Sequence, residues 1–375
     1  MANVSSSNGL EKRPKLRFPG FDEPWSIYKA EELFKNVADK NHPMETVLTI
    51  IQGKGTLPRE QAGRNIHYDD ASLANYKKVE QGDFIIHLRS FEGGLEMANE
   101  DGIVSPAYTI LRCMKPHSSL FYEAYFHTDE FINHILSKSV VGIRDGRQIS
   151  YEAFKWLGLP YCDLSEQERI AQLFCTLSHR IEKQQQMVDA LKKYKRGLIK
   201  LVFEKVMSEA HYQLPLSDLC ISISSGRTTV NESNGRYPLF GSTGIVGMTN
   251  TIEHDGDIVM VARVGANAGK VNFFSGRCGV TDNTLVIRVK ENTIHPKFLA
   301  YFLENFDLHK LIFGSGQPLV TGGQLKKIQS PVIAYKAQLL ITRSLESLDR
   351  IIGTQDTYME KLIQLKSGLM QRLFI

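Results

Sequence analysis

Three glycine-rich segments have spacings close to those of phosphate-binding or nucleophile-bearing loops. Residues 265–270 place three residues between the glycines where a P-loop has four, and Val271 follows where a metal-binding Ser or Thr is needed. Residues 241–244 lack the Gly-x-Ser-x-Gly spacing that exposes a strained nucleophile. Residues 53–55 (Gly-Lys-Gly) stand in no Walker context. We therefore expect turns and loops, not catalytic sites, at all three places.

The histidines, cysteines and prolines give no catalytic pattern either. The 11 histidines include no His-x-x-x-His pair around a Glu, and the five cysteines form no Cys-x-x-Cys pair. An Asn- or Asp-Pro-Pro-Tyr/Phe motif, which would hold a flipped base for methylation, is missing. We expect a chain without catalytic residues, without a bound metal and without a cofactor of its own.

What remains is binding, and the side chains best suited to it lie beside glycines and other turn residues. A guanidinium can contact a guanine edge or a phosphate, and an amide side chain matches the donor and acceptor of adenine. For each residue the alternative is an ordinary solvated surface position. The candidate DNA-binding residues are Arg59, Arg64, Arg227, Ser242, Thr243, Arg263, Asn267, Lys270, Arg277 and Gln317.

An internal repeat in the sequence predicts the elements that position these residues. At an offset of 171 residues, the 44-residue segment from Pro160 to Phe203 matches the segment from Pro331 to Phe374 at eleven positions, without a gap. About three matches would be expected by chance at ordinary composition. Duplication is therefore the favoured explanation, and a coincidence between two amphipathic helices is the alternative.

Each copy carries apolar residues in alternating steps of four and three, as in Ile170, Phe174, Leu177 and Ile181. This heptad spacing predicts a seam against another helix, about 33 residues long in each copy. No third helix of that length is evident, so the two copies should pair with each other. In an antiparallel pair Gln184 and Gln355 fall near the centre of the seams, where a buried polar pair would set the register. Solvation of both glutamines at a frayed seam is the alternative.

The last turns of the first long helix carry a cationic cluster at residues 192–200. Contact with a phosphate or a partner is one interpretation. The other, which we favour, is that these charges complement the helix dipole.

Segments rich in glycine and β-branched residues precede each long helix and predict two globular domains. We expect strands within residues 80–88, 104–112, 255–264, 271–274 and 284–289, and helices over residues 120–136 and 296–311. The offset of 171 fades before residue 131, which predicts similar helices and dissimilar domains. The expected boundaries are 1–160 and 207–331 for the domains, and 161–206 and 332–375 for the long helices.

Composition limits the class of protein further. The 375 residues are 42% hydrophobic and 23% charged, which is typical of folded domains, and the formal charge of +4 confines any nucleic-acid contact to local patches. The scattered cysteines favour a reducing cytoplasm, and no apolar run approaches the length of a membrane span.

Several segments, taken in order, resemble the specificity subunits of type I restriction-modification systems. They are residues 14–21 with Trp25, residues 102–108, residues 166–203 with the Glu-Gln-x-x-Ile start, and residues 237–247. The resemblance covers nearly the whole chain. It departs where Ser178 replaces the acidic residue that the second copy has at Asp349, and where residues 336–338 (Lys-Ala-Gln) stand for Ser-Glu-Gln at 165–167. Surfaces facing the partners could therefore be unequal.

The resemblance implies an α+β fold in which two target recognition domains are separated by two long helices that form an antiparallel coiled coil with a pseudo-two-fold internal repeat. It implies a non-catalytic, cytoplasmic subunit that binds double-stranded DNA at a bipartite site. The implied partners are two modification subunits, which methylate adenine with S-adenosylmethionine, and restriction subunits, which use ATP and Mg. A protein scaffold with two unlike binding domains is the alternative, and a stand-alone nuclease is the weakest interpretation.

Overall fold

The computed structural model describes residues 11–63, 70–142, 148–210, 212–229, 234–312 and 318–374. Two compact units divide the chain. Unit 1 holds the residues up to Gln184 together with those from Tyr358 onward, and unit 2 holds Gln185–Thr357. Each unit therefore contains one sheet-rich domain and one half of each long helix.

The two long helices are α5 (Leu164–Glu209) and α9 (Tyr335–Phe374), with 46 and 40 residues. Both are longer than the predicted 33 residues, because the helices continue beyond the ends of the shared heptad pattern. The carboxylate of Asp163 begins α5 by accepting the N–H of Ser165 at 2.8 Å.

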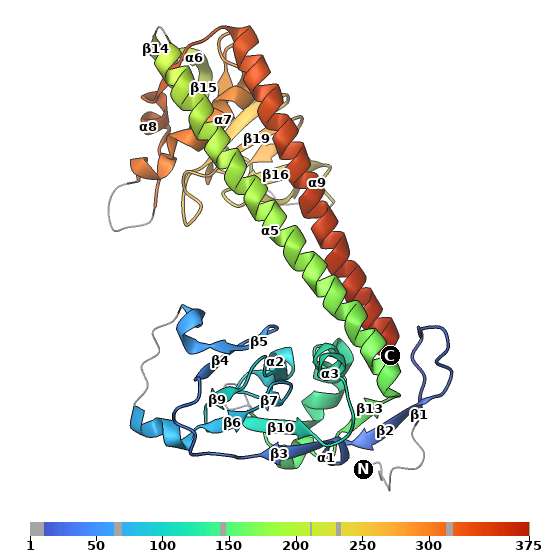
Figure 1. Cartoon of the computed structure of the whole chain (residues 1–375). Helices are drawn as coiled ribbons and strands as arrows, with labels where there is room; N and C mark the ends of the chain where they lie inside the picture. The colour runs from blue at the N-terminus through green and yellow to red at the C-terminus, as the bar shows by residue number, and fades with distance from the viewer. Residues whose placement is uncertain are drawn as a thin grey trace. The chain divides into compact units, whose positions relative to one another are not determined.

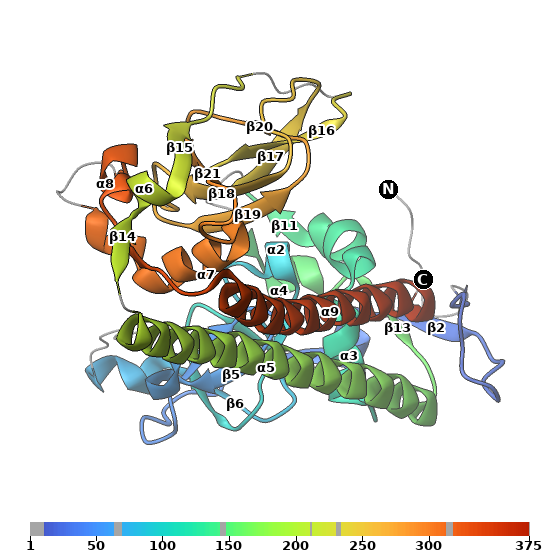
Figure 2. The same ribbon diagram turned by 90° about the horizontal axis from the view of Figure 1, so that it is seen from above.

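The helices run antiparallel. In unit 1 Lys366 lies beside Ser178, with 2.8 Å from Nζ to Oγ, and in unit 2 Lys195 lies beside Asp349, with 2.8 Å between Nζ and Oδ1. Residue numbers thus fall along α9 as they rise along α5, and Figures 1 and 2 both show the two ribbons side by side. The prediction of an antiparallel pair of duplicated helices is confirmed.

A phenylalanine near the end of each helix anchors it in one domain. Phe374 stacks on Phe174 with 5.8 Å between ring centroids and contacts Phe121 at 5.3 Å, within the core of unit 1. Phe203 contacts Phe298 at 5.2 Å within the core of unit 2. All five rings are buried. Such rings contribute strongly to packing because each buries a large apolar area.

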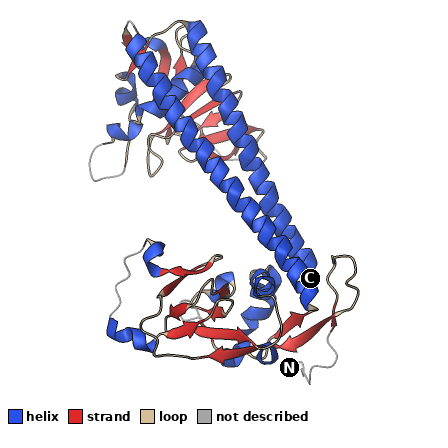
Figure 3. Cartoon of the chain, viewed as in Figure 1, coloured by secondary structure: helices blue, strands red, loops and turns tan. Residues whose placement is uncertain are grey.

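The domain of unit 1 is built on a four-stranded antiparallel sheet in the order β3-β10-β7-β8. Short helices and two-stranded ribbons surround it (Figure 3). The strands are β1 (Glu11–Lys12), β2 (Trp25–Lys29), β3 (Phe34–Val37), β4 (Leu48–Ile51), β5 (Gly55–Pro58), β6 (Lys77–Val79), β7 (Phe84–Ile86), β8 (Glu96–Met97), β9 (Gly102–Val104), β10 (Thr109–Cys113), β11 (Val140–Val141), β12 (Gln148–Ile149) and β13 (Gly158–Tyr161). The α-helices are α1 (Ala30–Leu33), α2 (Ser90–Gly93), α3 (Ser119–Phe126) and α4 (Tyr151–Phe154).

The domain of unit 2 is built on a four-stranded antiparallel sheet in the order β15-β21-β18-β19, beside a three-stranded sheet β17-β16-β20. The strands are β14 (Gln213–Pro215), β15 (Cys220–Ser225), β16 (Tyr237–Gly241), β17 (Gly244–Thr249), β18 (Asp257–Ala262), β19 (Val271–Ser275), β20 (Gly279–Val280), β21 (Thr284–Val289) and β22 (Gln329–Pro331). The helices are α6 (Leu216–Leu219), α7 (Pro296–Phe306) and α8 (Gly322–Lys326).

The two domains share the arrangement of their central four-stranded sheets, although their sequences and their other strands differ. Strands β3, β10, β7 and β8 of unit 1 correspond in order and direction to β15, β21, β18 and β19 of unit 2. A short helix, α1 or α6, comes directly before the first strand of each sheet, and a longer helix, α3 or α7, packs against the sheet. The offset between equivalent residues is 171 at the long helices and 177 between α3 and α7. Insertions between these elements cause the change, so the sequence match at an offset of 171 does not continue into the domains.

A duplicated glutamine fixes the longer domain helix against the coiled coil in both units. Oε1 of Gln167 accepts the N–H of Ser118 at 3.1 Å, and Oε1 of Gln338 accepts the N–H of His295 at 2.7 Å. Each side chain also donates to a carbonyl five residues earlier in its own chain, at 2.8 and 3.0 Å. Both glutamines are buried, so these bonds satisfy amide groups that water does not reach.

The amino-terminal segment closes onto the start of α5 through a buried carboxylate. Glu166 accepts two bonds from Arg17, at 2.7 and 2.9 Å, and one from Nε1 of Trp25 at 2.9 Å. The bond to Glu166 raises the pKa of Arg17. The second copy has Ala337 at this position, so the arrangement is specific to unit 1.

The local predictions had mixed outcomes. Strand β21 occupies the predicted residues 284–289. The strand expected over residues 104–112 is wrong in extent, because β9 ends at Val104 and β10 begins only at Thr109. The helix expected over residues 120–136 is wrong in extent, since α3 ends at Phe126 and a π-helical turn, Glu130–Ile135, follows it.

Candidate nucleic-acid interface

One edge of the unit 2 sheet collects the loops that carry most of the candidate residues. Strands β15 and β18 end at this edge, and β21 and β19 begin there. The register pairs Ala262 with Thr284, Ser225 with Leu285 and Val261 with Val271. The loops of residues 226–229, 263–270 and 281–283 therefore meet, and we call them together the unit 2 loop edge.

Backbone hydrogen bonds hold this edge. The N–H of Arg263 donates to the carbonyl of Asn283 at 2.9 Å, and the carbonyl of Arg263 accepts the N–H of Val320 at 2.9 Å. Within the β18–β19 loop, Lys270 N–H donates to the Asn267 carbonyl at 2.9 Å. This confirms a turn between strands over residues 265–270. A turn fixed by its own backbone holds its side chains in a narrow range of positions.

The hairpin between β16 and β17 brings Ser242 and Thr243 to the same edge. Strand β16 runs parallel to β20, and Thr281 donates its N–H to the carbonyl of Phe240 at 2.8 Å. The turn beyond β16 therefore lies next to the start of the 281–283 loop. Ser242 is half-buried and Thr243 is exposed.

The side chains of three cations at the unit 2 loop edge have no carboxylate partner among the described residues. Arg227 and Lys270 are exposed, and Arg263 is half-buried. Among the residues that the structure describes, none of the three forms an ion pair; Arg263 donates to the carbonyl of Asp282 at 3.5 Å. Such cations are available to an anionic ligand.

A half-buried carboxylate that sequence analysis missed, Glu253, fixes the Arg227 loop. Glu253 accepts the N–H of Arg227 at 2.9 Å, the hydroxyl of Thr228 at 2.7 Å and the N–H of Val280 at 3.3 Å. Burial by itself raises the pKa of Glu253, but these donors outweigh it, so the pKa is lowered and the carboxylate stays charged. No spacing pattern around Glu253 predicts this role, because its partners lie in two segments distant from it in the sequence, residues 227–228 and strand β20.

Arg277 lies at the opposite edge of the same sheet. It follows β19, whose last residue, Ser275, pairs with Asp257 at the start of β18. Its Nε donates to Asp255 at 3.0 Å. Arg277 is therefore separated from the other candidates and already has a carboxylate partner. Gln317 and Arg64 lie outside the described residues.

The corresponding edge of unit 1 carries a basic and aromatic group. Strand β3 ends at Val37 and β7 ends at Ile86, where β10 begins, because Thr109 pairs with Ile86. The side chains gathered there are Arg59, Tyr76, Lys77, His87 and Tyr108, which we call the unit 1 loop edge.

Contacts within the unit 1 loop edge are close. The guanidinium of Arg59 lies 5.9 Å from the ring centroid of Tyr76, and Nζ of Lys77 donates to the carbonyl of Tyr108 at 2.5 Å. The rings of His87 and Tyr108 lie 6.3 Å apart. Burial lowers the pKa values of Lys77 and His87. Of these five residues only Arg59 was a candidate, although the run Tyr76-Lys77-Lys78 was a signal in the sequence.

Two lysines of α5 form ion pairs with carboxylates of unit 2. Lys192 pairs with Asp356 at 3.1 Å, and Lys195 pairs with Asp349 at 2.8 Å and with Glu304 at 3.5 Å. These two lysines are thus engaged inside unit 2. Gln184 is 9% exposed and Gln355 is half-buried; they belong to different units, and their pairing stays a prediction.

None of the helices in the part of the chain that the structure describes has the length and apolar character of a membrane span. Within these ranges, no three or more His, Cys, Asp and Glu side chains gather as metal ligands.

Comparison with known proteins gives consistent matches. Residues 213–362 match the family model described as the type I restriction modification DNA specificity domain. The chain is 28% identical over 123 residues to the type I restriction enzyme EcoprrI specificity subunit of Escherichia coli, covering 33% of this chain and 30% of that protein. It is 33% identical over 98 residues to the putative type I restriction enzyme MjaX specificity subunit of Methanocaldococcus jannaschii, covering 24% and 23%. The alignments thus span less than a third of these relatives.

The fold is shared over nearly the whole chain. A crystal structure of a type I restriction-modification system S subunit from M. genitalium superposes with a TM-score of 0.64 at 14% identity, covering 96% of this chain and 99% of that one. The predicted architecture of two domains with a pair of long helices is therefore confirmed.

Proposed function

We propose that the chain is a specificity subunit of a type I restriction-modification system and that each of its two domains recognises one half of a bipartite DNA site. The match of residues 213–362 to the family model and the fold shared with a solved S subunit support this proposal. The observation that carries the proposal is the unit 2 loop edge, where Arg227, Arg263 and Lys270 have no carboxylate partner among the described residues. A sheet edge of the same topology in unit 1 carries Arg59 and Lys77. Repeated cationic edges on two domains suit two half-sites.

The side chains at the unit 2 loop edge suit two kinds of DNA contact, to phosphates and to base edges. Arg227 and Lys270 are exposed and suit phosphate contacts, which position the domain. Arg263 and Asn267 are half-buried within the turn that the backbone holds, so they suit contacts to guanine and adenine edges. Ser242 and Thr243, on the adjacent hairpin, can contribute hydroxyl contacts to either kind of group.

The paired helices α5 and α9 would set the distance between half-sites. Two weak recognition modules on a stiff connection act at high effective concentration for each other only when the half-sites match their separation. We assign methyl transfer, with S-adenosylmethionine, to two modification subunits docked on the coiled coil, and translocation and cleavage, with ATP and Mg, to restriction subunits. The chain itself would act without a catalytic site, in the cytoplasm.

A salt titration of DNA binding tests the proposal. The recognition site is first identified by sequencing methylated adenines in cells that carry the chain and a modification partner. We expect the affinity of the purified complex for that duplex to fall steeply with salt, because phosphate contacts release counterions. Lys270→Ala and Arg227→Ala should each reduce the slope by about one. Arg277→Ala, at the opposite edge, is the matched control and should leave the slope unchanged.

Either of two results would reject the proposal. Binding that ignores salt, or a purified complex that binds no duplex above background, would favour a protein scaffold with two unlike binding domains. Equal effects of all three substitutions would place the interface elsewhere on the domain.

A further inference from the structure

The surroundings of one duplicated lysine, Lys195 in unit 2 and Lys366 in unit 1, differ between the two units. In unit 2 Nζ of Lys195 contacts Asp349 at 2.8 Å and Glu304 at 3.5 Å, and the hydroxyl of Tyr301 donates to Asp349 at 2.5 Å. The ring of Tyr301 is 3% exposed and lies under the lysine, 5.3 Å from Nζ to the ring centroid. A carboxylate and an aromatic ring therefore fill the space around this amine.

The repeat identifies the equivalent positions in unit 1. The helix offset of 171 places Lys366 on Lys195 and Ser178 on Asp349. The domain-helix offset of 177 is fixed by the matching hydrogen bonds of the duplicated glutamines, and it places Ala124 on Tyr301. Unit 1 thus keeps the lysine and lacks both the carboxylate and the ring.

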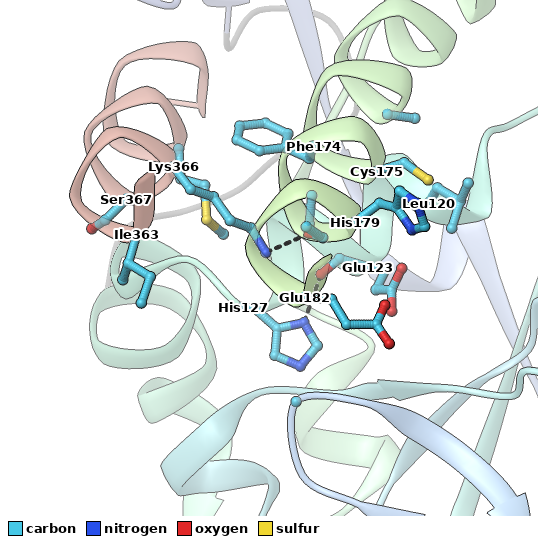
Figure 4. A pocket seen from close by; sticks show the side chains of 15 residues that line it. Leu120, Glu123, His127, Phe174, Cys175, His179, Glu182, Ile363, Lys366 and Ser367 are labelled. Carbon is cyan, nitrogen blue, oxygen red and sulfur yellow. Dashed lines mark hydrogen bonds between the residues drawn. The ribbon is translucent and has the colours of Figure 1, made fainter. Parts of the chain in front are cut away.

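A pocket of about 610 Å³ occupies that place in unit 1. Ala124, Phe174, Ile363 and Met370 contribute to its lining, and Figure 4 shows the side chain of Lys366 extending into it. The volume lies within the range of small-molecule sites. The pocket therefore has the size of a ligand site and an amine on its wall.

Lys366 and Glu123 both line the pocket but form no ion pair with each other. Lys366 is half-buried, and its Nζ donates to Ser178 at 2.8 Å, with no carboxylate within 4.0 Å among the described residues. Glu123, which also lines the pocket, is half-buried and stands where unit 2 has Ala300. Within the described part of the chain, its carboxyl group has no ion-pair partner. Unit 1 has thus lost the acid that pairs with its lysine and gained a separate carboxylate nearby.

We propose that this pocket binds a small aromatic zwitterion with the chemistry of an aromatic α-amino acid. The ligand carboxylate takes the place of the Asp349 carboxylate and contacts Lys366. Its ring takes the place of the Tyr301 ring, between Ala124 and Phe174. Its ammonium group contacts Glu123. The proposal is independent of DNA recognition, since the pocket is lined by no residue of either loop edge.

The test is calorimetric titration of the full chain with L-phenylalanine, 3-phenylpropanoate and 2-phenylethylamine. A hydrogen bond to a charged group changes affinity by about 10- to 100-fold. L-phenylalanine should therefore bind at least about tenfold more tightly than either analogue, since each analogue lacks one charged group. Lys366→Met should reduce the affinity for L-phenylalanine to that for 2-phenylethylamine, and Glu123→Gln should reduce it to that for 3-phenylpropanoate.

A variant whose pocket is filled by its own side chains is the matched control. The double substitution Ala124→Tyr with Ser178→Asp recreates the unit 2 arrangement and should abolish binding while DNA binding persists. No detectable binding of L-phenylalanine at millimolar concentration would overturn the proposal. Equal affinity of the wild-type chain, Lys366→Met and Glu123→Gln would overturn it too, because the ligand would then lie elsewhere.

Discussion

A buried carboxylate contacts a histidine within unit 1. Glu96 is fully buried and accepts the N–H groups of Gly53 and Gly55 at 2.7 and 2.9 Å, with Nε2 of His127 at 3.3 Å. Burial by itself raises the pKa of Glu96, but His127 and the two N–H groups outweigh it, so this pKa is lowered. Burial likewise lowers the pKa of His127, but Glu96 outweighs it, so this pKa is raised above 6.5.

This pair predicts a pH dependence of stability. A histidine whose folded pKa is raised stabilises the fold below its unfolded pKa, and this contribution is lost as pH rises through the folded pKa. The difference in free energy of unfolding between the wild-type chain and His127→Gln should therefore be largest near pH 6 and shrink toward pH 8. Urea unfolding across that range measures it. A difference that grows with pH would contradict the assigned pair.

The duplicated glutamines predict matched losses of stability. Gln167→Ala leaves the N–H of Ser118 and a carbonyl without their buried partner, which costs about 1–3 kcal/mol in free energy of unfolding. Gln338→Ala should cost a similar amount in unit 2. Gln172→Ala, at an exposed position of α5, is the control and should change little. Urea unfolding checks all three, and equal losses for Gln172 and Gln167 would show that the bridge contributes nothing.

At the scale of the elements, the ends of α5 and α9 are fixed by single aromatic rings. Phe374→Ala and Phe203→Ala should each cost about 3–5 kcal/mol, because a buried ring leaves a cavity when it is truncated. Hydrogen exchange followed by mass spectrometry should show faster exchange in unit 1 for the first substitution and in unit 2 for the second. Leu365→Ala and Leu201→Ala remove side chains that are 51% and 66% exposed, and they serve as controls. Uniform acceleration over both units would contradict this separate anchoring.

The elements also show what sequence alone could establish. The helix pair was predictable because heptad spacing and the ungapped offset survive over many residues. The shared topology of the two domains was not, because short strands such as β8 and β20 have two residues each and insertions shift the offset. The unit 2 loop edge was predictable only in part. Arg263 and Lys270 lie in one turn, whereas Glu253 depends on contacts between distant loops.

At the scale of the whole molecule, the two domains carry different side chains on the same arrangement of strands. Recognition by one domain should therefore be separable from recognition by the other. Replacing residues 207–331 with the equivalent segment of another specificity subunit should change one half of the methylated site and leave the other half unchanged. Sequencing of methylated adenines measures both halves at once. A change in both halves would show that the domains do not act independently.

The paired helices predict that the spacing between the half-sites depends on their length. Inserting one heptad into α5 and one into α9 keeps the apolar seam in phase, since the seam repeats every seven residues. At 1.5 Å per residue the insertion adds about 10 Å to the helix pair, which equals the rise of about three base pairs. The unspecified gap in the methylated site should therefore lengthen by up to about three base pairs while both half-sites keep their sequences. Inserting a heptad into α5 alone is the control, because it shifts one seam against the other and should destabilise the fold. A methylation map with altered half-site bases and the original gap would show that the helices do not set the spacing.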